Sequence, residues 1–236
     1  MSNEFLTKDV KLAKLPSDYG STGFKMFKGS ILNNVEIAYE TWGELSVNND
    51  NAVLLFTGLS PSSHAASSDI NSSEGWWEYM IGPNKPIDTN KYYVICVNSL
   101  GSCFGSTSPA SINTATGKIY GLDFPELSIE DIAKSGHAVL QTLGIDHAHT
   151  VMGPSMGGMT ALAYALLFPN SLSNLIVISA AARALPFTIS IRSLQRELIR
   201  SDPLWNNGVY GKNSAPLNGM KLARKLGLMS YRAANE

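Results

Sequence analysis

The chain has 236 residues, of which 44% are hydrophobic and 16% are charged, and its formal net charge is −1 at pH 7. This length suits one large α/β domain with a sizeable core. A near-neutral charge gives no general attraction to nucleic acid or to an anionic membrane surface. No apolar run reaches transmembrane length, and the first residues lack the continuous apolar stretch of a signal peptide.

The cysteines and histidines argue against disulfide and metal chemistry. Two cysteines, Cys96 in a predicted strand and Cys103 in a predicted loop, do not make a disulfide framework. A reduced, cytoplasmic setting is therefore expected. His147 and His149 would share one strand face, but no third ligand lies nearby in the sequence, so we expect no metal site.

Three strands are predicted in the first hundred residues. Residues 35–41 alternate between polar and apolar as a half-buried strand does. Residues 52–56 (AVLLF) and 92–97 (YYVICV) are continuous apolar runs, which is typical of buried parallel strands. Two long stretches rich in Ser, Gly, Asn and Pro, 58–90 and 98–125, follow the two apolar runs. Long loops after the carboxyl ends of strands are where open α/β sheets place their sites.

The next elements contain the most informative motif of the chain. Ser128 caps a helix predicted to run to about Leu143, and a short strand through Thr150 follows. The sequence then reads Gly153-Pro154-Ser155-Met156-Gly157 and enters an apolar helix. A G-x-S-x-G turn between a strand and a helix predicts a nucleophile elbow with Ser155 at its tip, although the pattern alone also occurs by chance.

The last elements differ in character from the rest. Residues 175–179 (LIVIS) predict one more buried strand, and helices are then expected over 183–202 and 219–226. The alternation of strands and helices predicts an α/β fold with a mostly parallel, doubly wound sheet and right-handed crossovers. We therefore divide the chain into an α/β core, 1–182, and a partial helical cap, 183–236.

These motifs resemble the homoserine O-acetyltransferase family, whose members are acyltransferases of the α/β-hydrolase fold. The resemblance covers nearly the whole chain and includes the Ser155 elbow. It also includes the segments 39–43, 76–77, 81–83, 98–106, 123–125, 202–203 and 223–224. Residues 59–68 together with 184–187 and 191–196 look most like the serine O-succinyltransferase branch.

The resemblance implies a mechanism and a set of site residues. Ser155 would attack the thioester of an acyl-CoA, either succinyl-CoA or acetyl-CoA, and the acyl group would pass to the hydroxyl of L-serine or L-homoserine. The backbone N–H groups of Met156 and Leu59 would form the oxyanion hole. Arg224 and Tyr231 match the family's substrate-contacting Arg and Tyr, and Arg192 would meet the carboxylate of a succinyl donor. The family also suggests a homodimer joined through the cap.

One departure from the family concerns the catalytic base. In this fold the nucleophile is followed along the chain by an acid and then by a histidine, but no histidine follows His149. His64 precedes the nucleophile and is interpreted as a pocket-lining or loop-fixing residue. We therefore expect the triad Asp and His to lie beyond Glu236, so that the chain is truncated and inactive by itself.

Two other functional classes remain open on sequence grounds. A serine hydrolase, or esterase, on the same fold would pass the acyl group to water instead of to an amino acid. A non-catalytic α/β binding domain would keep the elbow without using it. Serine against homoserine as acceptor, and succinyl against acetyl as donor, also stay open.

Overall fold

The computed structural model describes residues 6–16, 23–211 and 213–233. The chain divides into two compact units, 1–181 and 182–236. Each unit has its own arrangement of elements and is treated separately below.

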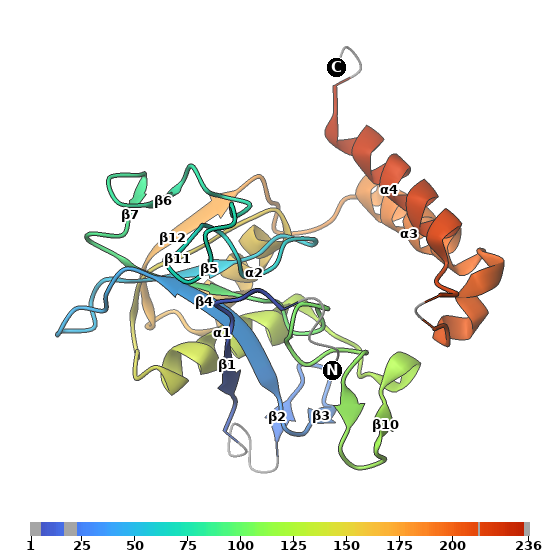
Figure 1. Ribbon diagram of the computed structural model, residues 1–236, viewed down its shortest axis with the longest axis horizontal. Coiled ribbons are helices and arrows are strands. Elements are labelled where there is room, and N and C mark those ends of the chain that lie inside the picture. Colours follow the sequence, from blue (N-terminus) through green and yellow to red (C-terminus); the bar gives the residue numbers. More distant parts are fainter. Residues whose placement is uncertain (1–5, 17–22, 212, 234–236) are drawn as a thin grey trace. The chain divides into compact units, whose positions relative to one another are not determined.

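The first unit is built on a six-stranded sheet with the order β1-β4-β8-β5-β11-β12. β8, β5, β11 and β12 run parallel, whereas β1 and β4 are antiparallel to their neighbours, and Figure 1 shows β1 running beside β4. The mostly parallel sheet of an α/β fold, predicted from the sequence, is confirmed. The strands span Lys11–Lys14 (β1), Glu36–Trp42 (β4), Ala52–Phe56 (β5), Tyr93–Val97 (β8), Ala148–Pro154 (β11) and Leu172–Ile178 (β12).

Both faces of the central strands are covered, which explains why β5 is apolar throughout. Helices α1 (Ile129–Thr142) and α2 (Met156–Leu167) pack on each other and on the face that contains Leu54 and Phe56. The opposite face packs against side chains from the first long loop, including Trp77 and Ile81. A strand between two apolar layers gains from hydrophobic residues at every position, so no alternation remains in its sequence.

The long loops contain short elements of their own. Two-residue strands pair as β6 (Ile81–Gly82) with β7 (Ile87–Asp88), as β9 (Ile112–Asn113) with β10 (Lys118–Ile119), and, before β4, as β2 (Phe24–Lys25) with β3 (Ile31–Leu32). A single 3₁₀ turn, η2, spans Gly121–Asp123. These pieces are too short to give a periodic pattern, so the sequence showed them only as loops.

The prediction of a buried strand over 175–179 is wrong in its burial and short in its extent. β12 spans Leu172–Ile178, and its middle residues are exposed, with 38% of Leu175 and 44% of Ile176 accessible. Within the described part of this unit, β12 pairs only with β11, so its other edge has no strand beside it. The residues are apolar enough for a central strand, but here they form the edge of the sheet.

The second unit is a pair of antiparallel helices, α3 (Pro186–Arg200) and α4 (Leu217–Tyr231), joined through the 3₁₀ segment η3 (Pro203–Gly208). Figure 1 shows the two helices side by side. Asp202 links the start of η3 to α4, because its carboxylate accepts hydrogen bonds from the N–H groups of Leu204 and Gly219. A Cβ on Gly219 would lie 2.4 Å from the Leu198 carbonyl oxygen, so only glycine allows this close approach of the helices.

The helix boundaries in this unit differ from those predicted. α3 begins three residues later than expected, because Pro186 takes the first helical position, where its missing N–H does no harm. α4 runs longer than expected at both ends. In the described ranges of the chain, no helix has both the length and the apolar character needed to cross a bilayer.

Candidate active site

Ser155 lies at a sharp turn between β11 and α2. Its backbone adopts φ 55° and ψ −121°, a conformation that is strained for any residue with a Cβ. The strand enters the turn beside β12, where the Ser155 N–H donates to the Ile178 carbonyl over 2.9 Å. The residue is exposed to solvent, so its hydroxyl is available to a substrate.

Glycines on either side of Ser155 make this turn possible. A Cβ on Gly153 would lie 2.4 Å from the backbone carbon of Gly157. A Cβ on Gly157 would lie 2.3 Å from the carbonyl oxygen of Phe56. The small residues of the G-x-S-x-G pattern therefore serve a packing purpose, since they bring the start of α2 against the end of β5. The turn has the geometry of a nucleophile elbow.

Two backbone N–H groups near this turn are open to an oxyanion. Met156 is the first residue of α2, so its N–H has no acceptor within the helix, whereas the amides of Gly158 and Met159 donate to the Ser155 carbonyl. Leu59 lies three residues after β5, and among the described residues no hydrogen-bond acceptor is found for its N–H. A helix N-terminus also favours negative charge in front of it. Met156 opens α2 and Leu59 follows β5, and their role as oxyanion donors stays a prediction.

None of the four histidines, all within the described ranges, hydrogen-bonds to Ser155. His137 stacks on Phe168 with ring centroids 3.8 Å apart. His147 and His149 bond to polar groups around β11 and β12, and no cluster that could hold a metal ion is found in the described part of the chain. His64 is bound to Glu40 and to the loop after β5. Ser155 therefore has no general base among these histidines.

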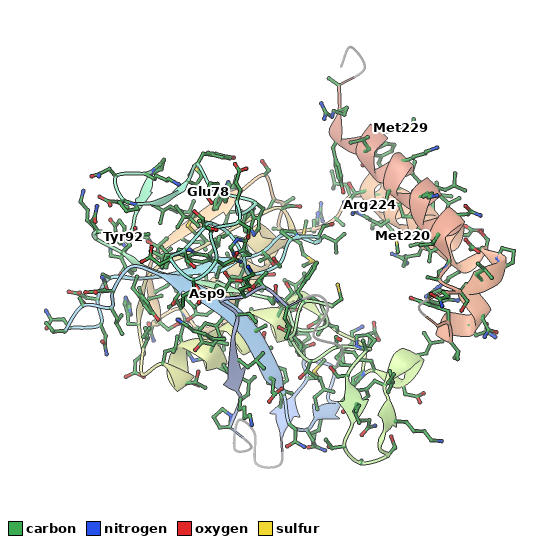
Figure 2. All side chains as sticks on the ribbon, viewed as in Figure 1. Asp9, Glu78, Tyr92, Met220, Arg224 and Met229 are labelled. Atoms are coloured by element: carbon green, nitrogen blue, oxygen red, sulfur yellow. The ribbon has the colours of Figure 1, made fainter. Side chains whose placement is uncertain are left out.

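Two of the cap residues predicted from the family resemblance, Arg192 and Tyr231, are hydrogen-bonded to each other. The guanidinium of Arg192 donates to the Tyr231 hydroxyl over 3.2 Å from each of two nitrogens, and to the Gln195 side-chain oxygen over 2.8 Å. Within the described residues, no carboxylate pairs with Arg192. Arg224 is on α4, between Met220 and Met229 along the helix, as Figure 2 shows.

The structure adds two residues that sequence reasoning missed. Gln195 links the helices, because its side-chain nitrogen donates to the Ala223 carbonyl over 2.9 Å while its oxygen accepts from Arg192. Glu40 is fully buried in β4. A charged residue within a strand predicted to be half-buried was a visible signal for Glu40, whereas the single glutamine of α3 gave none.

Comparison with known proteins identifies similar sequences. A family model described as alpha/beta hydrolase fold matches residues 51–236. A serine O-succinyltransferase from Litchfieldella anticariensis is 60% identical over 90% of this chain and 58% of its own length. A serine O-succinyltransferase from Stenotrophomonas maltophilia is 52% identical over 99% of this chain and 62% of its own length. The chain thus spans about three fifths of the curated relatives that it matches.

Solved structures with the same fold point in two functional directions. Homoserine O-acetyltransferase from Bacillus anthracis superimposes with a TM-score of 0.83 at 33% identity, covering 94% of this chain and 61% of its own. Esterase E22 superimposes with a TM-score of 0.85, also at 33% identity, covering 96% of this chain and 62% of its own. One of these proteins is named for acyl transfer to an amino acid and the other for ester hydrolysis.

Proposed function

The chain belongs to the α/β-hydrolase fold family, and we propose that it carries the nucleophile of an acyl-CoA-dependent O-acyltransferase acting on L-serine or L-homoserine. The observation that carries this proposal is the strained, exposed Ser155 at the start of α2, with two open amides nearby. The names of its relatives at 60% and 52% identity favour serine as acceptor and succinyl-CoA as donor. Homoserine with acetyl-CoA is the alternative suggested by the Bacillus anthracis structure.

In the proposed reaction Ser155 takes the acyl group first. Its Oγ forms a bond to the thioester carbon, the carbon–sulfur bond breaks, and the CoA thiol leaves with a proton. The amides of Met156 and Leu59 stabilise the oxygen that becomes negative in between. The acceptor hydroxyl then attacks the acyl-serine and frees Ser155.

Both steps need a general base, and the four histidines are engaged elsewhere. An oxyanion hole without a base retains only a small part of the rate enhancement of serine enzymes. We therefore expect negligible turnover from these 236 residues alone.

The cap residues are proposed to select the substrates. Arg192 has no carboxylate partner among the described residues, and its guanidinium, which donates to Tyr231 and Gln195, would bind the terminal carboxylate of a succinyl group. Arg224 and Tyr231 are proposed to bind the amino-acid acceptor, so Arg224→Ala should raise the acceptor KM far more than the acyl-CoA KM. Tyr231 already contacts Arg192, so the donor and acceptor sites would share this tyrosine.

Three further properties belong to the same proposal. We propose that the core extends over 1–182 and the cap over 183–236, that the protein is cytoplasmic, and that it forms a homodimer. Two free cysteines and a CoA thioester substrate suit a reducing compartment. No permanently bound cofactor is required by the chemistry, since acyl-CoA enters and leaves as a co-substrate.

A hybrid protein tests the proposed function directly. These 236 residues would be joined to the remaining C-terminal residues of the Litchfieldella anticariensis relative, with Ser155→Ala as the matched control. We expect an acyl adduct by intact-mass spectrometry only when Ser155 is present, and rapid thiol release only when an amino acid is added. An adduct in the Ser155→Ala hybrid would refute the assignment of the nucleophile.

The esterase alternative makes a different prediction for the same hybrid. It is favoured by the similarity to esterase E22. In that case the acyl-serine would be hydrolysed at the same rate with or without an amino acid, and simple esters would be turned over faster than CoA thioesters.

A further inference from the structure

Glu40 and His64 form a buried charged pair outside the elbow. Glu40 is fully buried in β4, and its Oε2 lies 2.8 Å from His64 Nδ1. Its other oxygen accepts from the hydroxyls of Thr7 and Ser63. His64 is 7% exposed. Hydrogen-bond partners therefore surround both oxygens of this buried carboxyl group.

The geometry around His64 fixes protons on both ring nitrogens. Nε2 lies 2.9 Å from the carbonyl oxygen of Ser73, which can only accept, so this nitrogen must donate. Nδ1 lies 2.8 Å from the carboxylate oxygen of Glu40 and 3.4 Å from Asn71 Nδ2, so the carboxylate is its nearer partner and the one that can accept a proton from it. Both nitrogens are therefore donors, as in an imidazolium ion.

The charged groups around the ring agree with this assignment. Burial acts to lower the pKa of His64, but the hydrogen bonds to Glu40 and Ser73, together with the charges of Glu40 and Glu78, raise it above the ordinary value. Cys96 lies opposite Glu40 in the sheet and stays a neutral thiol, because burial raises its pKa well above the ordinary value.

The same geometry excludes a second catalytic triad. Ser73 Oγ lies 3.2 Å from His64 Nε2, and Glu40 lies behind the ring, so the three residues superficially resemble Ser-His-acid. However, Nε2 donates to the Ser73 carbonyl, and the Ser73 hydroxyl donates to Asn71 Oδ1 over 2.6 Å. His64 has no free lone pair with which to take a proton from Ser73.

The charged pair lies at one end of the loop that carries Leu59. The loop begins where β5 ends, and Gly157 presses against this beginning at Phe56. It is held again at Ser63 and His64, whose side chains both bond to Glu40. Leu59 lies between these two attachments, and its N–H points to no described acceptor.

We propose that the Glu40–His64 ion pair positions the Leu59 amide at the elbow, with His64 acting as a fixed cation and not as a base. Glu40 and His64 are thus positioning residues for the oxyanion hole, which makes this inference rest on the proposed function. Loss of the His64 charge would release the second end of the loop. The first end, at Phe56, would stay in place.

The test uses the full 236-residue chain and follows the conformation of the loop, so it does not require catalysis. Nitrogen-15 NMR would follow the ring of His64 as the pH is raised, and hydrogen exchange would follow the amides of Ala65, Trp76 and Trp77. These three amides donate to Ser63, His64 and Ala65, so they report whether the loop is closed. The Ser155 amide, bonded to Ile178, reports on the elbow as an internal control.

In the unmodified chain, the hydrogen-exchange rates of the three loop amides are first corrected for the intrinsic effect of pH. We then expect these rates to rise as the pH is raised, with the same midpoint as the deprotonation of His64. In Glu40→Gln that midpoint should fall, and at pH 7 exchange should rise by about tenfold or more in the loop and not at Ser155. His149→Gln is the matched control and should leave the loop unchanged.

Several results would overturn the inference. A neutral His64 ring at pH 7 in the unmodified chain would do so. Exchange rates of the loop amides that do not change as His64 titrates would also do so. If the exchange rate in Glu40→Gln rises equally at Ser155 and at the loop amides, the Glu40–His64 pair stabilises the fold in general and does not position this loop. If the loop behaves as expected while the hybrid never acylates Ser155, the proposed function fails and the structural role of the pair stands.

Discussion

Replacing Ser155 by glycine should give a more stable protein than replacing it by alanine. Ser155 has φ 55° and ψ −121°. Alanine keeps a Cβ in that conformation, whereas glycine has none. A residue in a sparsely populated backbone region costs about 1–3 kcal/mol of stability, and glycine removes this cost. Against this, glycine gives the unfolded chain extra freedom, which costs about 0.4–1 kcal/mol.

The balance predicts that Ser155→Gly is more stable than Ser155→Ala by about 0.5–2 kcal/mol. Ser155 is exposed, so loss of its side chain adds little of its own. The free energy of unfolding would be measured by urea denaturation, followed by tryptophan fluorescence. In a Trp205→Phe background the remaining tryptophans, Trp42, Trp76 and Trp77, all report on the first unit.

Ser173 provides the matched control, because it is in β12 with an ordinary strand conformation. There the order should reverse, with glycine less stable than alanine by about 0.5–1 kcal/mol. If Ser155→Gly is no more stable than Ser155→Ala, while Ser173 behaves as stated, the elbow is not strained and the reasoning fails.

Three further predictions follow from contacts described above. Gly157→Ala should destabilise the fold by about 1–3 kcal/mol, since the added Cβ would meet the Phe56 carbonyl. Gly58→Ala should be tolerated, because the nearest atom to an added Cβ there is 3.8 Å away. Equal losses of stability for the two variants in urea denaturation would contradict this prediction. Burial acts to raise the pKa of Glu78, but hydrogen bonds from Gly75 and Ser67 outweigh it and hold the pKa at about 2, against 4.5 in the unfolded chain. A lowered pKa in the folded state stabilises the fold above pH 4.5. The unmodified chain should therefore be more stable than Glu78→Gln by at most about 3 kcal/mol, and this difference should disappear as the pH falls from 4.5 to 2. A difference that stays constant over this range would show that the carboxylate charge is not responsible. In the hybrid protein, Arg192→Ala should lower kcat/KM for succinyl-CoA by the equivalent of about 2–5 kcal/mol and change kcat/KM for acetyl-CoA little; equal losses for both donors would exclude Arg192 as the selector.

The features that local sequence encodes were the ones that could be predicted. β5 and β8 are short apolar runs bounded by polar residues, and the elbow is a short glycine-serine pattern between a strand and a helix. The elbow pattern, Gly153 to Gly157, has only five residues. In each case the information lies within a few neighbouring residues. The fold class follows from the order of such pieces, because parallel strands need crossovers of a limited number of kinds.

The features that depend on distant residues could not be predicted in the same way. Glu40 and His64 are 24 residues apart, and Arg192 and Tyr231 are 39 residues apart. No spacing rule relates such positions until the chain is folded. The exposure of β12 was missed for a related reason, since an apolar strand looks the same in sequence whether or not other parts of the chain cover its side chains.

The open edge of β12 also has a practical consequence. Its backbone N–H and C=O groups on one side, next to exposed Leu175 and Ile176, form a template that another extended peptide can join. A strand edge of this kind favours edge-to-edge association between copies at high concentration. In an engineering setting the same edge is an attachment point, where a supplied β-strand could complement the sheet and act as the second half of a split reporter.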